Sequence, residues 1–468
     1  MSSEHYMLNP ERSISTQHFH SLVEECEMGI VGHKVFVRLK DIPMYLSQKT
    51  RDSIRNRYSH SVEVGLSTEY MMNHISRQLG DDVNLNFFNV AKIVGMLHDI
   101  GHTAYSHDGE VILDRMIGEA SSHFETPIRF NANLNNFRRI EKYELYEVLP
   151  QDIREYALAS LLKRAKELRE YPEYHYLKTY QERAIKLEEE YLTSKGIRIE
   201  NKTGKTILCQ VMDLADENRY RVTDIIDSLN IYSKGKLKEI LKGMIRSEVR
   251  VKELRKLVHI KTIALEEVEG IHFEKLRIKD LLIALLERSS NAKTEFQNVM
   301  NTLSMAFNRN FRLDENGKLV PIDEEIEALR SDFQRIAAKH IWGSKRVEKI
   351  KKPYKHYFTT VADYFINQEF EPELIDSNTY KEALIELRKR EDYDTDARRE
   401  ELILIRNFLG GLTNAKIIEL YKRIMLVKFE AKLGYKLEKR ETLIEKNSVK
   451  NLKKKLDKYR QRLSIKEQ

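Results

Sequence analysis

Residues that break helices are scarce in this chain, and this scarcity constrains the fold more than any other single feature. The 468 residues include 18 Gly and 8 Pro, and so few breakers favour long helices over many short strands. Apolar residues recur with a helical period from about Ser59, and a strongly apolar helix is expected to start near Ile207. Further helical patterns lie at 86–97, 108–117, 223–260, 278–306, 322–342, 354–370, 379–408 and 413–430. The sequence therefore predicts an all-α fold.

Three segments stand apart from this pattern. Lys34–Leu39 is a candidate for a small strand. Asn308–Pro321 contains Asn316-Gly317 and is the clearest candidate for a hairpin or loop in the second half of the chain. Residues 150–200 are dense in Lys, Arg, Glu and Tyr, which is typical of solvated helices.

The positive charge of the chain is concentrated at its C-terminal end. The formal net charge is +7, but residues 431–468 hold 13 Lys and Arg against 5 Asp and Glu, which leaves 67 basic and 68 acidic residues in 1–430. The body is thus near neutral and carries a basic tail, 431–468. Such a tail could bind the phosphates of single-stranded nucleic acid, although a frayed, solvated terminal helix explains the same composition.

Other features exclude whole classes of protein. The chain has two cysteines, Cys26 and Cys209, which cannot build a disulfide framework or a four-thiolate zinc site. The longest apolar run, Leu281–Leu286, is far shorter than a membrane span. The N-terminus lacks the apolar core of a secretory signal. We therefore expect a cytoplasmic protein with no membrane partner.

The densest chemical signal lies in residues 95–110. This segment holds His98, Asp99, His102, His107, Asp108 and Glu110, directly after an apolar helix. A neutral imidazole beside a carboxylate at a buried helix end suits a divalent metal, which accepts mixed nitrogen and oxygen ligands. His60, on an amphipathic helix 38 residues upstream, and a later acidic residue could complete the set. A single buried histidine is more often a hydrogen-bonded core residue, but the dense cluster favours a metal site.

His107 and Glu110 form a second pattern within this segment. They are three residues apart, which places them on one face of a short helix. A carboxylate in this position can orient an imidazole and raise its basicity, as general acid–base chemistry requires. Acidic residues also favour a helix start without any catalytic role.

Together these motifs resemble the HD-domain metal-dependent phosphohydrolases and, within them, the deoxynucleoside triphosphate triphosphohydrolases, a dGTPase-like family. The likeness rests on His98-Asp-Ile-Gly-His-Thr-Ala-Tyr-Ser-His-Asp-Gly-Glu110, on Arg57-Tyr-Ser-His60-Ser-Val-Glu-Val, and on Met212–Asp224. It implies an HD-domain helical fold over 51–430, with an insertion around 150–205, a C-terminal helical extension and an unfamiliar N-terminal segment, 1–50. Looser likeness covers Phe130–Arg138, with Asn135 or Asn136 in place of Gln, and Asn407–Asn414, with Asn at both acidic positions.

The resemblance also implies a site and a reaction. One divalent cation (Mn, Mg or another transition metal) would be held by His60, His98, Asp99 and Asp216. Alignment of Met212–Asp224 with the corresponding family segment makes Asp216, and not Asp213, the last of these ligands. Water would attack the α-phosphorus of a dNTP and release a deoxynucleoside and tripolyphosphate. His107, oriented by Glu110, would assist the attacking water or protonate the departing 5′-oxygen. The remaining implied residues are Arg57 and Lys163 for phosphates, Tyr220 for the sugar, Asp224 for the 3′-hydroxyl, and His102 as a further candidate.

Other interpretations stay open. Lys163 also fits a solvated face, and Tyr220 also fits plain helix packing. Another HD-type nucleotidase or phosphodiesterase is the alternative enzyme, and a nucleotide-sensing or nucleic-acid-binding protein with an inert HD core is the alternative without catalysis. The resemblance further implies a homo-oligomer with a nucleotide activator.

Overall fold

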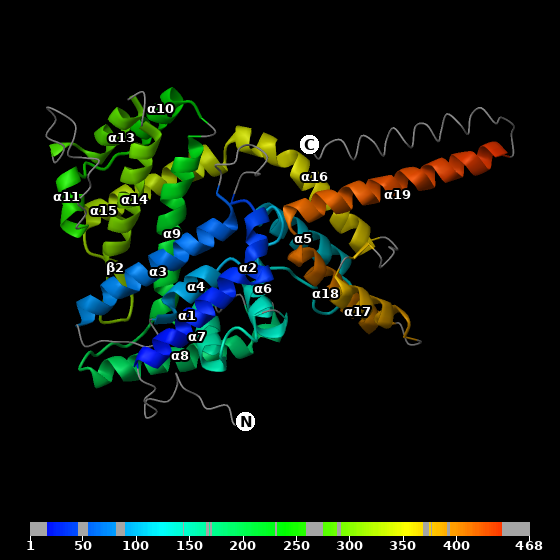
Figure 1. Cartoon of the computed structure of the whole chain (residues 1–468), viewed down its shortest axis with the longest axis horizontal. Helices are drawn as coiled ribbons and strands as arrows, with labels where there is room; N and C mark the ends of the chain where they lie inside the picture. Colours follow the sequence, from blue (N-terminus) through cyan, green and yellow to red (C-terminus); the bar gives the residue numbers. More distant parts are fainter. Residues whose placement is uncertain are drawn as a thin grey trace. The chain divides into compact units, whose positions relative to one another are not determined.

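The computed structural model describes residues 16–44, 55–80, 89–143, 145–164, 168, 171–229, 232–258, 275–287, 292–367, 374–375, 377–390 and 394–441. These residues are predominantly helical and contain one two-stranded sheet (Figure 1), so the predicted all-α fold is confirmed. The chain divides into two compact units, of which the first is Met1–His102 with Ala132–Lys351 and the second is Thr103–Asn131 with Lys352–Gln468. The predicted boundaries at residues 50 and 430 and the insertion at 150–205 stay predictions.

The first unit contains most of the helices. They are α1 (Thr16–Gly32), α2 (Lys34–Val37), η1 (Arg38–Asp41), α3 (Arg57–Leu79), α4 (Ala91–Leu97), α6 (Ala132–Arg138), η4 (Arg139–Tyr143), α7 (Gln151–Leu161), η6 (Pro172–Tyr174), α8 (Tyr176–Ser194), α9 (Ile207–Ser228), α10 (Lys234–Met244), α11 (Val251–Leu257), α13 (Ile278–Glu287), α14 (Ala292–Arg309), α15 (Glu324–Ile336) and η8 (Ala337–Trp342). The two strands, β1 (Phe311–Leu313) and β2 (Leu319–Pro321), also belong to it.

Helix α9 links the two hydrophobic clusters of the first unit. Its first turns, including Leu208 and Met212, pack with α3, α4, α7 and α8 in one cluster. Its later turns, including Val222 and Ile226, pack with α10, α13, α14 and α15 in the other. Asp216 therefore lies on the part of the helix where one cluster gives way to the next.

Local signals set the ends of the helices that carry site residues. The Asn56 side chain accepts a hydrogen bond from Ser59 N at 2.9 Å at the start of α3, and Gly80 ends that helix with φ +125°. Thr206 caps α9 in the same way, with Oγ1 2.9 Å from Cys209 N. Such side-chain caps satisfy backbone N–H groups that have no partner within the helix.

The predicted small strand at Lys34–Leu39 is wrong. These residues form α2 and the start of η1, and the His33 ring accepts a hydrogen bond from Val35 N at 3.4 Å. Val35 and Leu39 are both buried, and this four-residue spacing matches one helical face. The hairpin prediction is confirmed, because Phe311, Arg312 and Leu313 pair antiparallel with Pro321, Val320 and Leu319.

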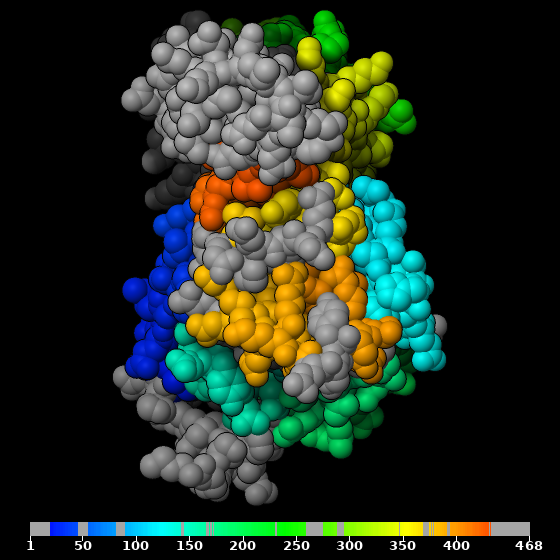
Figure 2. Space-filling view, turned by 90° about the vertical axis from the view of Figure 1, so that its right-hand side faces the viewer, coloured from blue at the N-terminus to red at the C-terminus, as the bar shows by residue number. Residues whose placement is uncertain are grey.

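The second unit consists of α5 (His107–Ala120), the greater part of α16 (Lys345–Asn367), α17 (Asn378–Arg388), α18 (Thr395–Gly411) and α19 (Asn414–Glu441). Its core joins apolar residues of α5, α16, α18 and α19. On the face in Figure 2, α17 and α18 lie side by side on the surface of this unit. Of the predicted basic tail, 442–468 lie outside the described residues.

Among the helices of the described ranges, none combines the length and the apolar character needed to cross a bilayer.

Candidate metal centre

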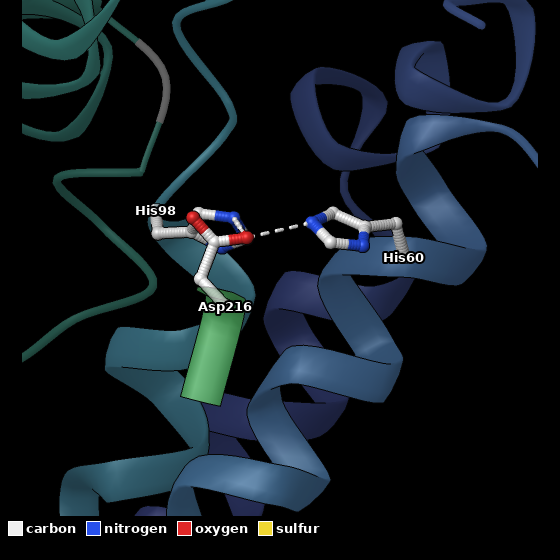
Figure 3. Close-up of side chains that lie close together, drawn as sticks. All are labelled: His60, His98 and Asp216. Atoms are coloured by element: carbon white, nitrogen blue, oxygen red, sulfur yellow. Dashed lines mark hydrogen bonds and ion pairs between the residues drawn. The ribbon is translucent and has the colours of Figure 1, made fainter. Parts of the chain in front are cut away.

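Three elements of the first unit converge at the predicted metal ligands. His60 lies near the start of α3, His98 follows directly after α4, and Asp216 lies near the middle of α9. All three pairs of these helices are in contact. In Figure 3 the two imidazoles and the Asp216 carboxylate point toward one another. Residues separated by up to 156 positions in the sequence therefore meet at one point.

The donor atoms of these residues are spaced as ligands of one cation would be. The Oδ1 atom of Asp216 lies 3.0 Å from His60 Nε2 and 3.5 Å from His98 Nε2. The Oδ2 atom of Asp99 lies 3.3 Å from His98 Nε2 and 3.8 Å from His60 Nε2. Ligand atoms at about 2.0–2.2 Å from a shared cation lie about 3–3.5 Å apart. The donor set therefore fits a divalent cation, and the ligand atoms of His60, His98 and Asp216 all lie within 4.8 Å of one another.

A hydrogen bond fixes the tautomer that such a site requires. The Nδ1 atom of the buried His98 lies 2.6 Å from Gly95 O, and only a protonated Nδ1 can donate to a carbonyl. In the neutral ring the Nε2 lone pair then faces the carboxylates of Asp99 and Asp216. A ligating histidine is normally held by its second nitrogen in this manner.

The carboxylates give the site a negative electrostatic potential. Burial disfavours the charged ring of His98, but the carboxylates of Asp99 and Asp216 outweigh it and raise its pKa to about 10. Burial opposes ionisation of Asp99 as well, yet the charges of Arg57 and His98 hold its pKa well below the usual range. Burial also opposes ionisation of Asp216, but the charges of His98 and Lys163 hold its pKa well below the usual range. Both carboxylates are therefore ionised and available to a cation.

Two predicted phosphate-binding cations contact these carboxylates directly. The guanidinium of Arg57, buried at the start of α3, forms an ion pair with Asp99 Oδ2. The Nζ atom of Lys163 lies 3.0 Å from Asp213 Oδ1 and 3.3 Å from Asp216 Oδ2. Burial alone would lower the pKa of Lys163, but Asp216 and Asp213 raise it well above its usual value. Lys163 thus contacts the carboxylate of Asp216 and, with 18% of its side chain exposed, does not lie on a solvated face.

His102 also belongs to this group. Its Nδ1 atom lies 3.2 Å from Asp99 Oδ1, on the carboxylate oxygen that does not face His98. The ring is buried, so His102 supports the orientation of Asp99.

Tyr220 and Asp224 lie on α9 beyond Asp216, and both meet a residue that sequence reasoning missed. The Nε1 atom of Trp342 donates to Asp224 Oδ2 at 2.6 Å, and the rings of Trp342 and Tyr220 are 5.6 Å apart. Burial raises the pKa of Asp224 to about 7 and that of Tyr220 to about 12. Trp342 is the single tryptophan of the chain, which was the one sequence signal that marked it.

Two glycines set the separation of the helices that carry the histidines. A Cβ atom on Gly95 would lie 2.7 Å from the Gly65 Cα, so the two backbones touch with no side chain between them. Glycine is required for so close an approach. On these two closely packed segments, the ring centroids of His60 and His98 are 5.4 Å apart.

The predicted pair of His107 and Glu110 lies in the second unit, at the start of α5. The Nδ1 atom of His107 is 3.1 Å from Glu110 Oε2, and the His107 side chain is 74% exposed. The two preceding residues, Tyr105 and Ser106, have φ of +60° and +57°, an uncommon conformation that often accompanies functional sites. The exposed imidazole is therefore accessible to a ligand and is held by a carboxylate.

Comparison with protein families finds no matching family, but individual relatives are found. A deoxyguanosinetriphosphate triphosphohydrolase-like protein 2 of Vibrio cholerae is 28% identical over 182 residues, which is 38% of this chain and 39% of that protein. A deoxyguanosinetriphosphate triphosphohydrolase-like protein of Clostridium tetani is 29% identical over 115 residues, 25% of this chain and 28% of that protein. One of Ruegeria sp. is 31% identical over 88 residues, 19% of this chain and 21% of that protein.

The resemblance to the dGTPase-like family is confirmed. The matched segments span well under half of the length of these dGTPase-like relatives.

Proposed function

We propose that this chain is a metal-dependent dNTP triphosphohydrolase that converts dGTP, or several dNTPs, to deoxynucleoside and inorganic tripolyphosphate. The observation that carries the proposal is the convergence of two imidazole nitrogens and the ionised Asp216 carboxylate, whose Oδ1 atom lies 3.0 Å from His60 Nε2 and 3.5 Å from His98 Nε2. Similarity to dGTPase-like proteins supports the choice of a nucleoside triphosphate as substrate.

His60, His98, Asp99 and Asp216 would hold the cation in this proposal. When bound, the cation supplies Lewis acidity toward a phosphate oxygen and toward water. A triphosphate carries about four negative charges, and a charge of this size needs fixed cations close to it. Arg57 and Lys163, which already contact carboxylates of the donor set, are the residues that we assign to phosphate binding.

The remaining residues would position the nucleoside and move the proton. The oxygen of water forms the new bond to the α-phosphorus, the bond from phosphorus to the 5′-oxygen breaks, and the 5′-oxygen receives a proton. We assign proton transfer to His107, because its side chain is exposed and its Nδ1 atom lies 3.1 Å from Glu110 Oε2, a carboxylate that can orient the ring. Tyr220 is assigned to the sugar and Asp224 to the 3′-hydroxyl, on the strength of the motif at 212–224.

Assembly and regulation enter the proposal from the family resemblance alone. We propose a cytoplasmic homo-oligomer that a nucleotide activates, and the basic tail, 431–468, remains a candidate for binding single-stranded nucleic acid.

A matrix of cations and nucleotides tests the reaction. The full chain is incubated with Mn²⁺, Mg²⁺ or Co²⁺ and with each dNTP, singly and in pairs, and the products are separated by ion chromatography. We expect tripolyphosphate in equal amount to deoxynucleoside, and in ¹⁸O-labelled water the label should enter tripolyphosphate. Orthophosphate as the sole inorganic product would refute the proposal and favour a nucleotidase.

A further inference from the structure

The loop that carries three polar residues of the site is bonded through its backbone to the side chains of Arg38, Asn135 and Asn136. His98–His102 follows α4 and contributes His98, Asp99 and His102. Among the described residues, its backbone–backbone hydrogen bonds outside helices run from Ile100 N to Leu97 O and from His102 N to Asp99 O. Its carbonyl groups are buried and therefore need donors from elsewhere.

Arg38 supplies two of these bonds from the N-terminal segment. Its Nη2 atom donates to Ile100 O at 2.6 Å and to His102 O at 2.7 Å. Arg38 lies at the start of η1, where Leu39 is buried in the core of the first unit. The guanidinium is thus held in place by its own packed segment, 62–64 residues before the carbonyls that it binds.

Asn136 on α6 binds the same loop through both ends of its amide. Its Nδ2 atom donates to His98 O at 2.6 Å, and its Oδ1 atom accepts from Gly101 N at 2.6 Å. Asn135 adds a bond from Nδ2 to Gly101 O at 2.7 Å. A Cβ atom on Gly101 would lie 2.1 Å from Ala132 O, so only glycine allows α6 to come this close.

These contacts hold the backbone of His98 and of His102 directly and the backbone on both sides of Asp99. His98 O is bonded to Asn136, His102 O is bonded to Arg38, and Asp99 lies between the bonded residues His98 and Ile100. Metal ligands must be held to within about 0.5 Å of their working positions, and residues that orient ligands change metal affinity by about 10- to 100-fold when they are lost.

We propose that Arg38 and Asn136 are positioning residues that clamp the backbone of the loop His98–His102 and so fix His98 and Asp99 for a divalent cation. This inference rests on the metal site of the proposed function. It assigns to the N-terminal segment a role in building the site, although the segment contributes no ligand.

Titration of the full-length chain with Mn²⁺, followed by the electron paramagnetic resonance of the free ion, tests the clamp. The variants are Arg38→Met, Arg38→Lys and, as a matched control, Lys34→Met, which removes one positive charge from an exposed residue four positions away. We expect Arg38→Met to weaken Mn²⁺ binding about 10-fold or more. Arg38→Lys should fall between it and the wild type, and Lys34→Met should bind as the wild type does.

A second variant, Asn136→Asp, tests the clamp independently if Arg38→Met does not fold. It keeps the acceptor for Gly101 N but replaces the donor to His98 O by an oxygen, so it should also weaken Mn²⁺ binding about 10-fold while circular dichroism stays unchanged. Wild-type affinity in folded Arg38→Met or Asn136→Asp would overturn the clamp. If the wild type binds no divalent ion, the metal site and the clamp both fall. If it binds Mn²⁺ but hydrolyses no dNTP, only the reaction falls, and the affinity ratios still decide the clamp.

Discussion

Glu188, a buried carboxyl group outside the metal centre, allows a quantitative test of the electrostatics in the first unit. It lies on α8 with 1% exposure, and its Oε1 atom accepts from Tyr156 OH at 2.7 Å. Its Oε2 atom accepts from Ile207 N at 2.8 Å, at the start of α9. Burial raises the pKa of Glu188 to about 8, despite these hydrogen bonds, and the charge of Glu189 adds to the rise. The perturbation is Glu188→Gln, which keeps a carbonyl acceptor but cannot ionise.

The pKa shift fixes the sign and the size of the effect. In the unfolded chain the carboxyl loses its proton near its ordinary pKa of 4.5, whereas in the folded chain it keeps the proton up to about pH 8. The folded state binds more protons between these values, so rising pH destabilises the wild type. The difference between a pKa of 4.5 and one of about 8, at about 1.36 kcal/mol per unit, corresponds to about 5 kcal/mol. The free energy of unfolding of the wild type falls by this amount between pH 4.5 and 8. Glu188→Gln should escape this loss.

The assay is denaturant unfolding at one-unit steps from pH 5 to pH 9. The fluorescence of Trp342, the single tryptophan, reports on the unit that contains Glu188. The stability of the wild type relative to Glu188→Gln should fall across this range by about 4–5 kcal/mol. The control Glu190→Gln, which removes an exposed carboxylate two residues away, should show no such trend. A difference that stays constant within about 1 kcal/mol, or that rises with pH, would refute the reasoning.

Three further predictions concern the site and the turn before α5. Asp216→Asn should lower Mn²⁺ affinity and kcat/KM at least about 10-fold. Asp213→Asn, one turn away and bonded to Lys163, should keep Mn²⁺ affinity within about threefold of the wild type, and calorimetry measures both affinities. His107→Gln should lower kcat by about 10²- to 10⁴-fold with Mn²⁺ binding unchanged, and an equal loss of binding would contradict a role in proton transfer. Asn414 Oδ1 accepts from Tyr105 N at 2.8 Å, so Asn414→Asp should retain stability while Asn414→Ala should lose about 1–3 kcal/mol by thermal unfolding.

The sequence predicted the ligands of the candidate centre better than it predicted their supports. His60, His98 and Asp216 carry recognisable residue types at recognisable spacings, and the structure brings them together. Arg38 and Trp342 gave no comparable signal, because a bond to a backbone carbonyl or to a buried carboxylate across 64 or 118 positions leaves no periodic pattern. Their partners are set by how the helices pack, which local sequence does not specify.

One prediction of local structure is wrong, and one alternative that the sequence left open is excluded. The apolar run at 34–39 was interpreted as a strand, but short apolar runs fit a helix as well as a strand until their neighbours are known. The solvated face that stayed open as an alternative for Lys163 rested on composition, whereas the side chain of this lysine is 18% exposed and lies beside Asp213 and Asp216.

The contact between Gly65 and Gly95 makes the distance between His60 and His98 adjustable through residues that are not ligands themselves. A methyl group on Gly65 would meet Met96 Cγ at 2.8 Å and Lys92 O at 2.9 Å, and relieving that overlap would push α4 away from α3. His98 would then move outward from His60 while every donor atom stayed present. Oxygen ligands lie about 2.0–2.1 Å from Mg²⁺ and about 2.3–2.6 Å from Ca²⁺. Ion preference in this fold would thus respond to helix spacing as well as to ligand chemistry, and an alanine at position 65 would shift it toward larger ions.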